Sequence, residues 1–191
     1  MNGDVVFETE RLVVRKATTA DADFYHRLWT HPQVMRYVGF SQGLPITREE
    51  LKERLASEPP SAFDRLLVVE KKESGEPIGE CMVATPDEAG IVEPDIKLLP
   101  EHQGRGYGRE LWRALIAYQF EHTDGKAVQT TPNVDNVAAI RLYESVGATR
   151  VAEGVFRFPA EMQAYTTPVP HYVYRLYRAD WDRLNSKEGT E

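Results

Sequence analysis

A glycine-rich turn near the middle of the chain, residues 103–108, limits the possible folds more than any other segment. It reads Gln-Gly-Arg-Gly-Tyr-Gly; residues 95–99 before it have the pattern of a β-strand, and residues 109–116 after it have that of a helix. A turn that opens a helix presents unpaired backbone N–H groups and the positive end of the helix dipole. The three glycines also allow a phosphate to approach closely, because no Cβ intervenes. The sequence therefore predicts a site for a phosphate-bearing ligand.

The remaining strand and helix signals follow an order that indicates a mixed sheet. The turn Ser74-Gly75-Glu76-Pro77 predicts a hairpin, and Thr47-Arg48-Glu49-Glu50 is a capping box that predicts the start of a helix. We expect strands at 11–15, 66–70, 78–83, 93–99, 126–131, 149–156 and 171–177, and helices at 19–30, 47–57, 109–122 and 136–146. This order is typical of an α+β fold rather than a doubly wound parallel sheet. We expect a single domain over residues 1–191, with a core at about 8–178 and a flexible tail at 185–191.

Composition and charge narrow the classes of function. A chain of 191 residues with 41% hydrophobic and 28% charged residues is ordinary for one globular domain. Its net charge of −7 argues against a nucleic-acid partner, because binding to a phosphate backbone requires a basic surplus. No apolar run approaches the length of a membrane span, and the N-terminus lacks the basic and apolar regions of a secretory signal. We therefore expect a cytoplasmic protein with no membrane partner.

The cysteine and histidine residues of this chain carry no pattern of a disulfide or a metal site. Cys81 is the single cysteine, which rules out an internal disulfide, and its apolar surroundings predict a buried thiol rather than a nucleophile. The five histidines form no HxH or HxxxH pair, and no carboxylate cluster accompanies them. We therefore expect no metal site.

The glycine turn does not match two common nucleotide-binding motifs. A P-loop requires Lys followed by Ser or Thr after its glycines, and neither pair follows Gly108. A dinucleotide-binding turn requires a third glycine where Arg109 stands, and it belongs at the first strand of its fold rather than at mid-chain. A different phosphate ligand is therefore expected.

Three segments of the chain together resemble a known family. The pattern Gln103-x-x-Gly106-x-Gly108 resembles the pyrophosphate-binding motif of the GNAT superfamily of acyl-CoA-dependent N-acetyltransferases, and residues 136–148 resemble the later helix of that family beside the cofactor. Residues 8–37 are similar to the Rim-type branch, which includes ribosomal-protein N-terminal acetyltransferases. The resemblance covers about residues 8–178. It implies a mixed, mostly antiparallel sheet flanked by helices, with the acyl-CoA site at a splay between central strands.

The resemblance implies acetyl-CoA as the co-substrate. In this family the strand before the turn pairs with the pantetheine arm, and the turn binds the pyrophosphate. The predicted cofactor-binding residues are Leu98, Leu99, Gln103, Gly104, Arg105, Gly106, Tyr107, Gly108, Asn136 and Tyr143. The alternative for the glycines is a tight strand-to-helix turn that holds no ligand.

Acetyl transfer to an amine needs a proton donor for the departing thiolate and a base for the ammonium. The resemblance assigns the first role to Tyr143, since a phenol has an ordinary pKa of about 10 against about 8.5 for a thiol. It places Asn136 against the cofactor arm or a nearby water. The alternatives are a core aromatic residue for Tyr143 and a helix cap for Asn136.

The resemblance does not fix which residue acts as the base. In related enzymes a carboxylate on the strand before the turn takes this role, sometimes through water. Glu93 ranks first here, Asp95 and Glu80 are further candidates, and each could instead be a solvated or ion-paired acid. Pro94 lies between the first two candidates and predicts a sheet edge, a bulge or a strand that starts later.

The acceptor is expected to be a primary amine, either a protein N-terminus or a small molecule such as a polyamine, an amino acid or an aminoglycoside. The loop 157–170 and the first two helices form the predicted substrate end. Direct attack in a ternary complex is favoured, because Cys81 is poorly placed to carry an acyl group. The rival function is a non-catalytic acyl-CoA-binding sensor or scaffold. The chain is expected to be a monomer or a homodimer.

Overall fold

The computed structural model describes residues 3–59, 61 and 63–188. Its strands are β1 (Val5–Glu8), β2 (Leu12–Lys16), β3 (Arg65–Lys71), β4 (Pro77–Val83), β5 (Ile91–Val92), β6 (Asp95–Leu98), β7 (Ala127–Thr130), β8 (Thr149–Phe156) and β9 (Val169–Tyr177). Its α-helices are α1 (Ala22–Trp29), α2 (Pro32–Met35), α3 (Arg48–Ala56), α4 (Tyr107–His122), α5 (Val137–Ser145) and α6 (Arg178–Glu188). Short 3₁₀ turns join them: η1 (Thr19–Asp21), η2 (Arg36–Val38), η3 (Pro100–His102) and η4 (Ala160–Met162).

The strands form two sheets that separate in the middle of the molecule. One sheet has the order β1-β2-β3-β4-β6 with antiparallel neighbours, and the other has the order β5-β7-β9-β8. β5 lies parallel to β7, but the next strand in sequence, β6, pairs with β4 of the other sheet. The chain changes sheets at Glu93-Pro94, where proline has no N–H to continue a ladder. The arrangement confirms the predicted mixed, mostly antiparallel α+β fold, with β6 starting after Pro94.

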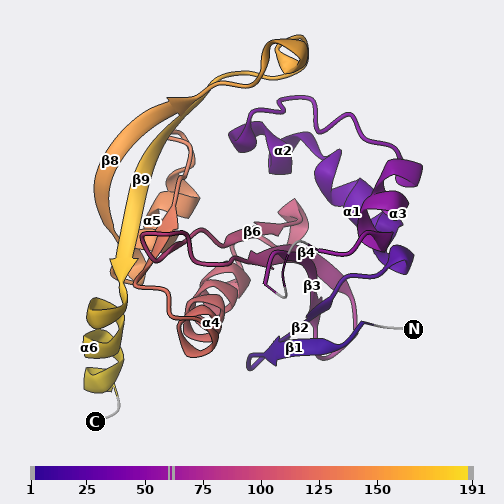
Figure 1. Ribbon diagram of the computed structural model, residues 1–191. Helices are drawn as coiled ribbons and strands as arrows, with labels where there is room; N and C mark the ends of the chain where they lie inside the picture. The colour runs from indigo at the N-terminus through magenta and orange to yellow at the C-terminus, as the bar shows by residue number, and fades with distance from the viewer. Residues whose placement is uncertain (1–2, 60, 62, 189–191) are drawn as a thin grey trace.

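Helices cover both faces of the larger sheet (Figure 1). On β3, Leu67 and Val69 belong to a core cluster that includes Trp112 of α4, whereas Val68 belongs to a second cluster with residues of α1 to α3. Successive side chains of a strand point to opposite faces, so an apolar run is buried on both sides. The sheet is therefore the middle layer, with α4 on one face and α1 to α3 on the other.

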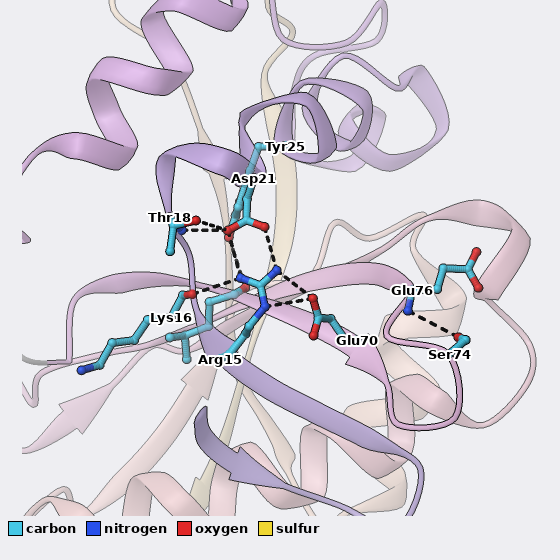
Figure 2. A network of polar contacts seen from close by, with 9 residues as sticks. Arg15, Lys16, Thr18, Asp21, Tyr25, Glu70, Ser74 and Glu76 are labelled. Carbon is cyan, nitrogen blue, oxygen red and sulfur yellow. Dashed lines mark hydrogen bonds and ion pairs between the residues drawn. The ribbon is translucent and has the colours of Figure 1, made fainter. Parts of the chain in front are cut away.

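A buried ion network joins the N-terminal helices to the sheet (Figure 2). The Nη2 atom of Arg15, on β2, lies 2.7 Å from Oδ1 of Asp21 in η1 and 2.7 Å from Oε1 of Glu70 on β3. The Asp21 carboxylate also accepts hydrogen bonds from the backbone N–H and the hydroxyl of Thr18. All three charged residues are buried. Because charges removed from water need partners, the network holds the start of α1 against the sheet.

The structure contains helices and strands that the sequence patterns did not predict, namely β1, β5, α2 and α6. Secondary structure extends beyond the predicted core of 8–178 at both ends, and α6 includes residues 185–188 of the predicted tail at 185–191. The bounds of the domain and the flexibility of the tail stay predictions. Residues 189–191 lie outside the described part of the chain.

Long-range contacts explain why α6 is ordered although its own sequence is polar. Trp181 packs against the Phe120 ring with centroids 6.5 Å apart and belongs to the main core cluster. The Arg178 guanidinium donates to the carbonyls of Phe120, Thr123 and Gly125 at the end of α4. A cation at a helix C-terminus is favourable, because the carbonyls there carry partial negative charge.

Within residues 3–59, 61 and 63–188, no helix combines the length and apolar character that crossing a bilayer requires. No three His, Cys, Asp or Glu side chains in those ranges are placed to hold a metal ion. The lack of a metal, the cytoplasmic location and the oligomeric state stay predictions.

Candidate active site

A cavity of about 950 Å³ lies where the two sheets separate. Its wall combines β6, the glycine turn, the end of β7, the start of α5 and the α2–η2 segment. The sequence-predicted residues that line it are Glu93, Asp95, Leu98, Gln103, Gly104, Gly106, Gly108, Asn136 and Tyr143. The predicted residues outside this lining are Glu80, Leu99, Arg105 and Tyr107. The fold thus brings the turn, a candidate base and a candidate proton donor to one cavity.

The glycine turn presents its backbone donors without a partner from the described chain. α4 begins after Gly106, its N-cap residue, and no side chain caps that end. The N–H groups of residues 104–109 have no acceptor among the described residues. Gly104 and Gly106 have φ of +71° and +84°, a left-handed conformation that favours glycine. The free N–H groups and the dipole of a 16-residue helix fit a diphosphate.

Arg11 and Glu110 fasten the turn to the N-terminal strands. Arg11 Nε lies 2.6 Å from Glu110 Oε2, and Arg11 Nη1 donates to the Arg105 carbonyl at 3.2 Å. The Arg11 guanidinium lies over the Tyr107 ring, 4.5 Å from its centroid. The Thr9 hydroxyl donates to the same Glu110 carboxylate. Arg105 and Tyr107 therefore shape the turn, and the Tyr107 ring contacts Arg11 rather than the cavity.

β6 supplies an unpaired strand edge to the cavity. It pairs with β4 on one side, and no strand among the described residues pairs with its other edge. Gln103 Nε2 donates to the Leu98 carbonyl at 2.9 Å, which braces the end of the strand. Leu99 is buried, and its N–H donates to the Ile78 carbonyl, so its side chain belongs to the core. An amide-bearing ligand can pair with the free edge as an added strand would.

α5 brings Asn136 and Tyr143 to the same cavity. Asn136 is the N-cap: its Oδ1 accepts from the Ala139 N–H at 3.2 Å, and its Nδ2 has no partner within the described chain. The Tyr143 ring packs on Trp112 with centroids 5.0 Å apart. Burial raises the pKa of Tyr143 above its ordinary value, and the charge of Asp95 raises it further. The phenol is therefore a weaker acid than the sequence-based comparison with a thiol assumed.

The three candidate bases have different surroundings. Glu93 is exposed in the break between β5 and β6, and it accepts a hydrogen bond from the Gln129 amide. Asp95 is ion-paired with Lys97. Glu80 is 4% exposed and lies outside the cavity lining. Within the described chain, Glu93 is the candidate that lines the cavity without a cation as partner.

Lys97 is a residue of the site that the sequence patterns did not single out. It lies on β6 directly opposite Glu80 of β4, and its Nζ is 3.1 Å from Glu80 Oε1. Nζ also donates to Asp95 Oδ2. Burial alone would lower the pKa of Lys97, but the charges of Asp95 and Glu80 raise it above its ordinary value, so the ammonium stays charged. Alternation along β6 places Asp95 and Lys97 on one face, whereas the contact with Glu80 depends on strand register.

The loop after β8 packs against the segment that follows η2, and none of its residues belongs to the cavity lining. The Phe158 ring packs against Phe40 with centroids 5.2 Å apart, and the Thr167 N–H donates to the Gly39 carbonyl at 2.9 Å. A Cβ at Gly39 would lie 2.4 Å from the Phe158 ring, so the close contact requires glycine there. Figure 1 shows the tip of the β8–β9 hairpin reaching above α2. The predicted substrate loop thus contacts the N-terminal helical segment.

Known proteins share both the sequence pattern and this fold. The family described as acetyltransferase (GNAT) domain matches residues 11–149. The uncharacterized N-acetyltransferase p20 of Bacillus licheniformis is 27% identical over 154 residues, which are 78% of this chain and 84% of p20. The N-alpha-acetyltransferase RimI of Mycobacterium tuberculosis is 32% identical over 102 residues, which are 49% of this chain and 62% of RimI. The crystal structure of spermidine N-acetyltransferase from Vibrio cholerae, with CoA and spermine, has a TM-score of 0.72 and 24% identity, over 89% of this chain and 97% of that one.

The matched segment includes the glycine turn, β6 and α5, which are the parts that form the cavity. The partial similarity to RimI agrees with the Rim-type resemblance of the N-terminal residues. The family match covers most of the chain and agrees with the geometry of the site. The chain belongs to the GNAT acetyltransferase family and is an N-acetyltransferase.

Proposed function

We propose that the protein transfers an acetyl group from acetyl-CoA to a primary amine by direct attack within a ternary complex. The observation that carries this proposal is that the amide-lined turn, the free edge of β6 and the Tyr143 phenol meet in one cavity. The turn fits a diphosphate, the edge fits an amide-bearing arm, and the phenol can donate a proton. Bound acetyl-CoA would supply the activated acetyl thioester.

Each proposed catalytic residue has one task. Glu93 takes a proton from the acceptor ammonium, directly or through a water, so that a neutral amine can attack the thioester carbon. Tyr143 donates its Oη proton to the departing sulfur as the C–S bond breaks, and the phenolate regains a proton from the newly acylated nitrogen, directly or through water. Asn136 Nδ2 donates to the cofactor arm beside that bond. Gln129 holds Glu93 in place, because it donates to Glu93 while its own carbonyl accepts from Arg175 Nε at 2.7 Å.

The surroundings of Cys81 argue against a covalent acyl-cysteine route. Its side chain lies in the core cluster beneath α4 and is 1% exposed. Burial raises the pKa of the Cys81 thiol well above its ordinary value, which suppresses the nucleophilic thiolate. These observations support direct attack by the amine.

Replacing Glu93 with Gln tests the proposed base. We expect kcat/KM for the amine to fall by about 10²-fold or more at neutral pH, which is the range of general base catalysis. The rate should recover as pH rises toward the pKa of the acceptor, because more amine then arrives already neutral. Asp95→Asn is the comparison and should have the smaller effect, because Asp95 is bound to Lys97. The reverse ranking in thiol-release assays would move the base role to Asp95.

A thiol-release assay with acetyl-CoA tests the function as a whole. The acceptors are peptides with free N-termini, amino-acid amides, polyamines and an aminoglycoside. We expect turnover with at least one of them, and initial rates with two varied substrates that give intersecting double-reciprocal lines. Parallel lines would contradict direct attack. Acetyl-CoA binding without turnover on any amine would favour the rival function of a sensor or scaffold.

A further inference from the structure

The amine end of the cavity is the part of the lining away from the glycine turn. The carboxylates that line it are matched by as many cations, and this restricts the acceptor. The charged residues in the lining are Glu93, Asp95, Arg36, Lys97 and Arg109. Arg109 lies in the first turn of α4, beside the glycine turn, and so belongs to the phosphate end. The amine end is left with two carboxylates and two cations. An acceptor site for a polycation would instead need an excess of free carboxylates.

Lys97 is already bound to the two carboxylates nearest to it, Asp95 in the cavity lining and Glu80 behind it. Its Nζ bonds Asp95 and lies 3.1 Å from Glu80 Oε1, which also accepts from Trp29 Nε1 at 2.8 Å. The Lys97 side chain is 17% exposed and that of Glu80 is 5% exposed. Charges buried to this degree stay paired, because neither group can return to water at low cost. Asp95 is therefore not free to receive an ammonium group from a substrate.

Glu93 is then the carboxylate that remains for the acceptor. It accepts from the neutral Gln129 amide and has no cationic partner within the described residues. One free carboxylate matches one ammonium, namely the group to be acetylated. A second ammonium in the cavity would lose its hydration, find no free carboxylate among the lining residues and face Lys97 and Arg36.

We propose that Lys97 is a specificity-determining residue that restricts the acceptor to amines with a single positive charge and excludes diamines and polyamines. This inference rests on the proposed function, because it concerns the acceptor of the same site. The fold shared with spermidine N-acetyltransferase of Vibrio cholerae does not carry that substrate over, since 24% identity shows the fold alone. The arrangement of Lys97, Asp95 and Glu80 points to a different acceptor class from the polyamine named for that neighbour.

The decisive variant combines Lys97→Met with Glu80→Gln. Lys97→Met alone would leave Glu80 buried without its cation, which is strongly destabilising. The second change removes that charge and keeps an oxygen acceptor for Trp29, so the double variant frees Asp95 without a new buried charge. Glu80→Gln alone is the matched control, because it retains Lys97 and its pair with Asp95. Circular dichroism checks that each variant is folded.

The readout is the ratio of kcat/KM values for monocationic and polycationic acceptors. Thiol release is measured with n-butylamine and alanine amide, and with 1,4-diaminobutane and spermidine. In the wild type and in Glu80→Gln, we expect the better monocation to exceed both polycations by about tenfold or more. In the double variant the ratio should fall by about tenfold, because Asp95 can then receive the second ammonium. The KM for acetyl-CoA should stay the same.

The outcomes separate the role of Lys97 from the proposed function. A wild-type preference for spermidine or 1,4-diaminobutane would overturn the role of Lys97 and leave N-acetyl transfer intact. An unchanged ratio in a folded double variant would do the same. If the double variant does not fold, Lys97→Gln combined with Glu80→Gln replaces it, and an unchanged ratio in that folded variant would overturn the role of Lys97. An absence of turnover with every amine would overturn the proposed function, and this inference with it.

Discussion

Replacing Tyr143 with Phe is expected to lower kcat by at least about tenfold, and by up to about 10⁴-fold, the upper range of general acid catalysis. The change removes the phenol oxygen and leaves the ring packed on Trp112. The affinity for acetyl-CoA should hold, because the turn and the edge of β6 are untouched. Steady-state thiol release measures kcat, and isothermal titration measures the Kd of acetyl-CoA.

The pH dependence of kcat gives a second signature of this proton donor. Burial and the charge of Asp95 raise the pKa of Tyr143 above its ordinary value of about 10. A donor with a raised pKa keeps its proton in alkaline solution. The wild type should therefore show no loss of kcat from this group below about pH 10. A decline well below that pH would indicate another proton donor.

Tyr177→Phe is the matched control for Tyr143→Phe. Tyr177 is 43% exposed on β9 and lies outside the cavity lining, so its hydroxyl should be dispensable. An unchanged kcat in Tyr143→Phe would remove Tyr143 from the mechanism. Parallel losses of kcat and of acetyl-CoA affinity would instead assign its hydroxyl to binding.

Replacing Arg15 with Met is expected to lower the free energy of unfolding by about 3–5 kcal/mol. The variant leaves two buried carboxylates, Asp21 and Glu70, without the cation that lies 2.7 Å from each. A loss of this size corresponds to a fall in Tm of roughly 10 °C for a chain of this length. Urea titration and thermal melts followed by circular dichroism measure both quantities.

The effect of Arg15→Met should depend on pH. Burial alone would raise the pKa of Asp21, but the hydrogen bonds from Arg15 and Thr18 lower it below its ordinary value. A lowered pKa contributes stability that is present above about pH 4 and is lost as pH falls through the folded-state pKa. Without Arg15 this contribution disappears. The difference in free energy of unfolding between the wild type and Arg15→Met should therefore become smaller below about pH 4.

Arg48→Met provides the comparison for an exposed ion pair. Arg48 Nε lies 2.6 Å from Asp23 Oδ1, but the two side chains are 54% and 82% exposed. We expect a loss of less than about 1 kcal/mol, because water screens the pair and side-chain entropy opposes it. Equal losses in Arg48→Met and Arg15→Met would contradict the role assigned to burial in the Arg15 network.

Much of the site was predictable because its signals are local. The glycines at 103–108 predict a turn, and in the structure Gly104 and Gly106 have left-handed backbone conformations. The capping box at Thr47 forms as predicted, with Glu50 accepting from the Thr47 N–H. Pro94 was expected to interrupt a strand, and β6 begins directly after it. Each of these features depends on backbone chemistry within a few residues.

Features that depend on distant contacts escaped the sequence patterns. Residues 185–188 are polar, so their helix was not predicted, but α6 is held by Trp181 and Arg178 against the end of α4. The position of the loop at 157–170 could not be predicted, because it is set by aromatic packing of Phe158 on Phe40 from the opposite end of the chain. Neither contact leaves a periodic mark in the sequence.

The sequence by itself determined the glycine-rich turn that opens a helix and the mixed sheet, because glycine, proline and strand-helix periodicity act over short stretches of backbone. Its resemblance to the GNAT family, carried by short motifs, was confirmed by the family match. The sequence left open which charges compensate one another. That was decided by the register of β4 against β6, which sets Lys97 opposite Glu80, and by the burial of both side chains. Coulombic interactions depend on distance and on exclusion of water, and both arise only when strands far apart in sequence are packed together.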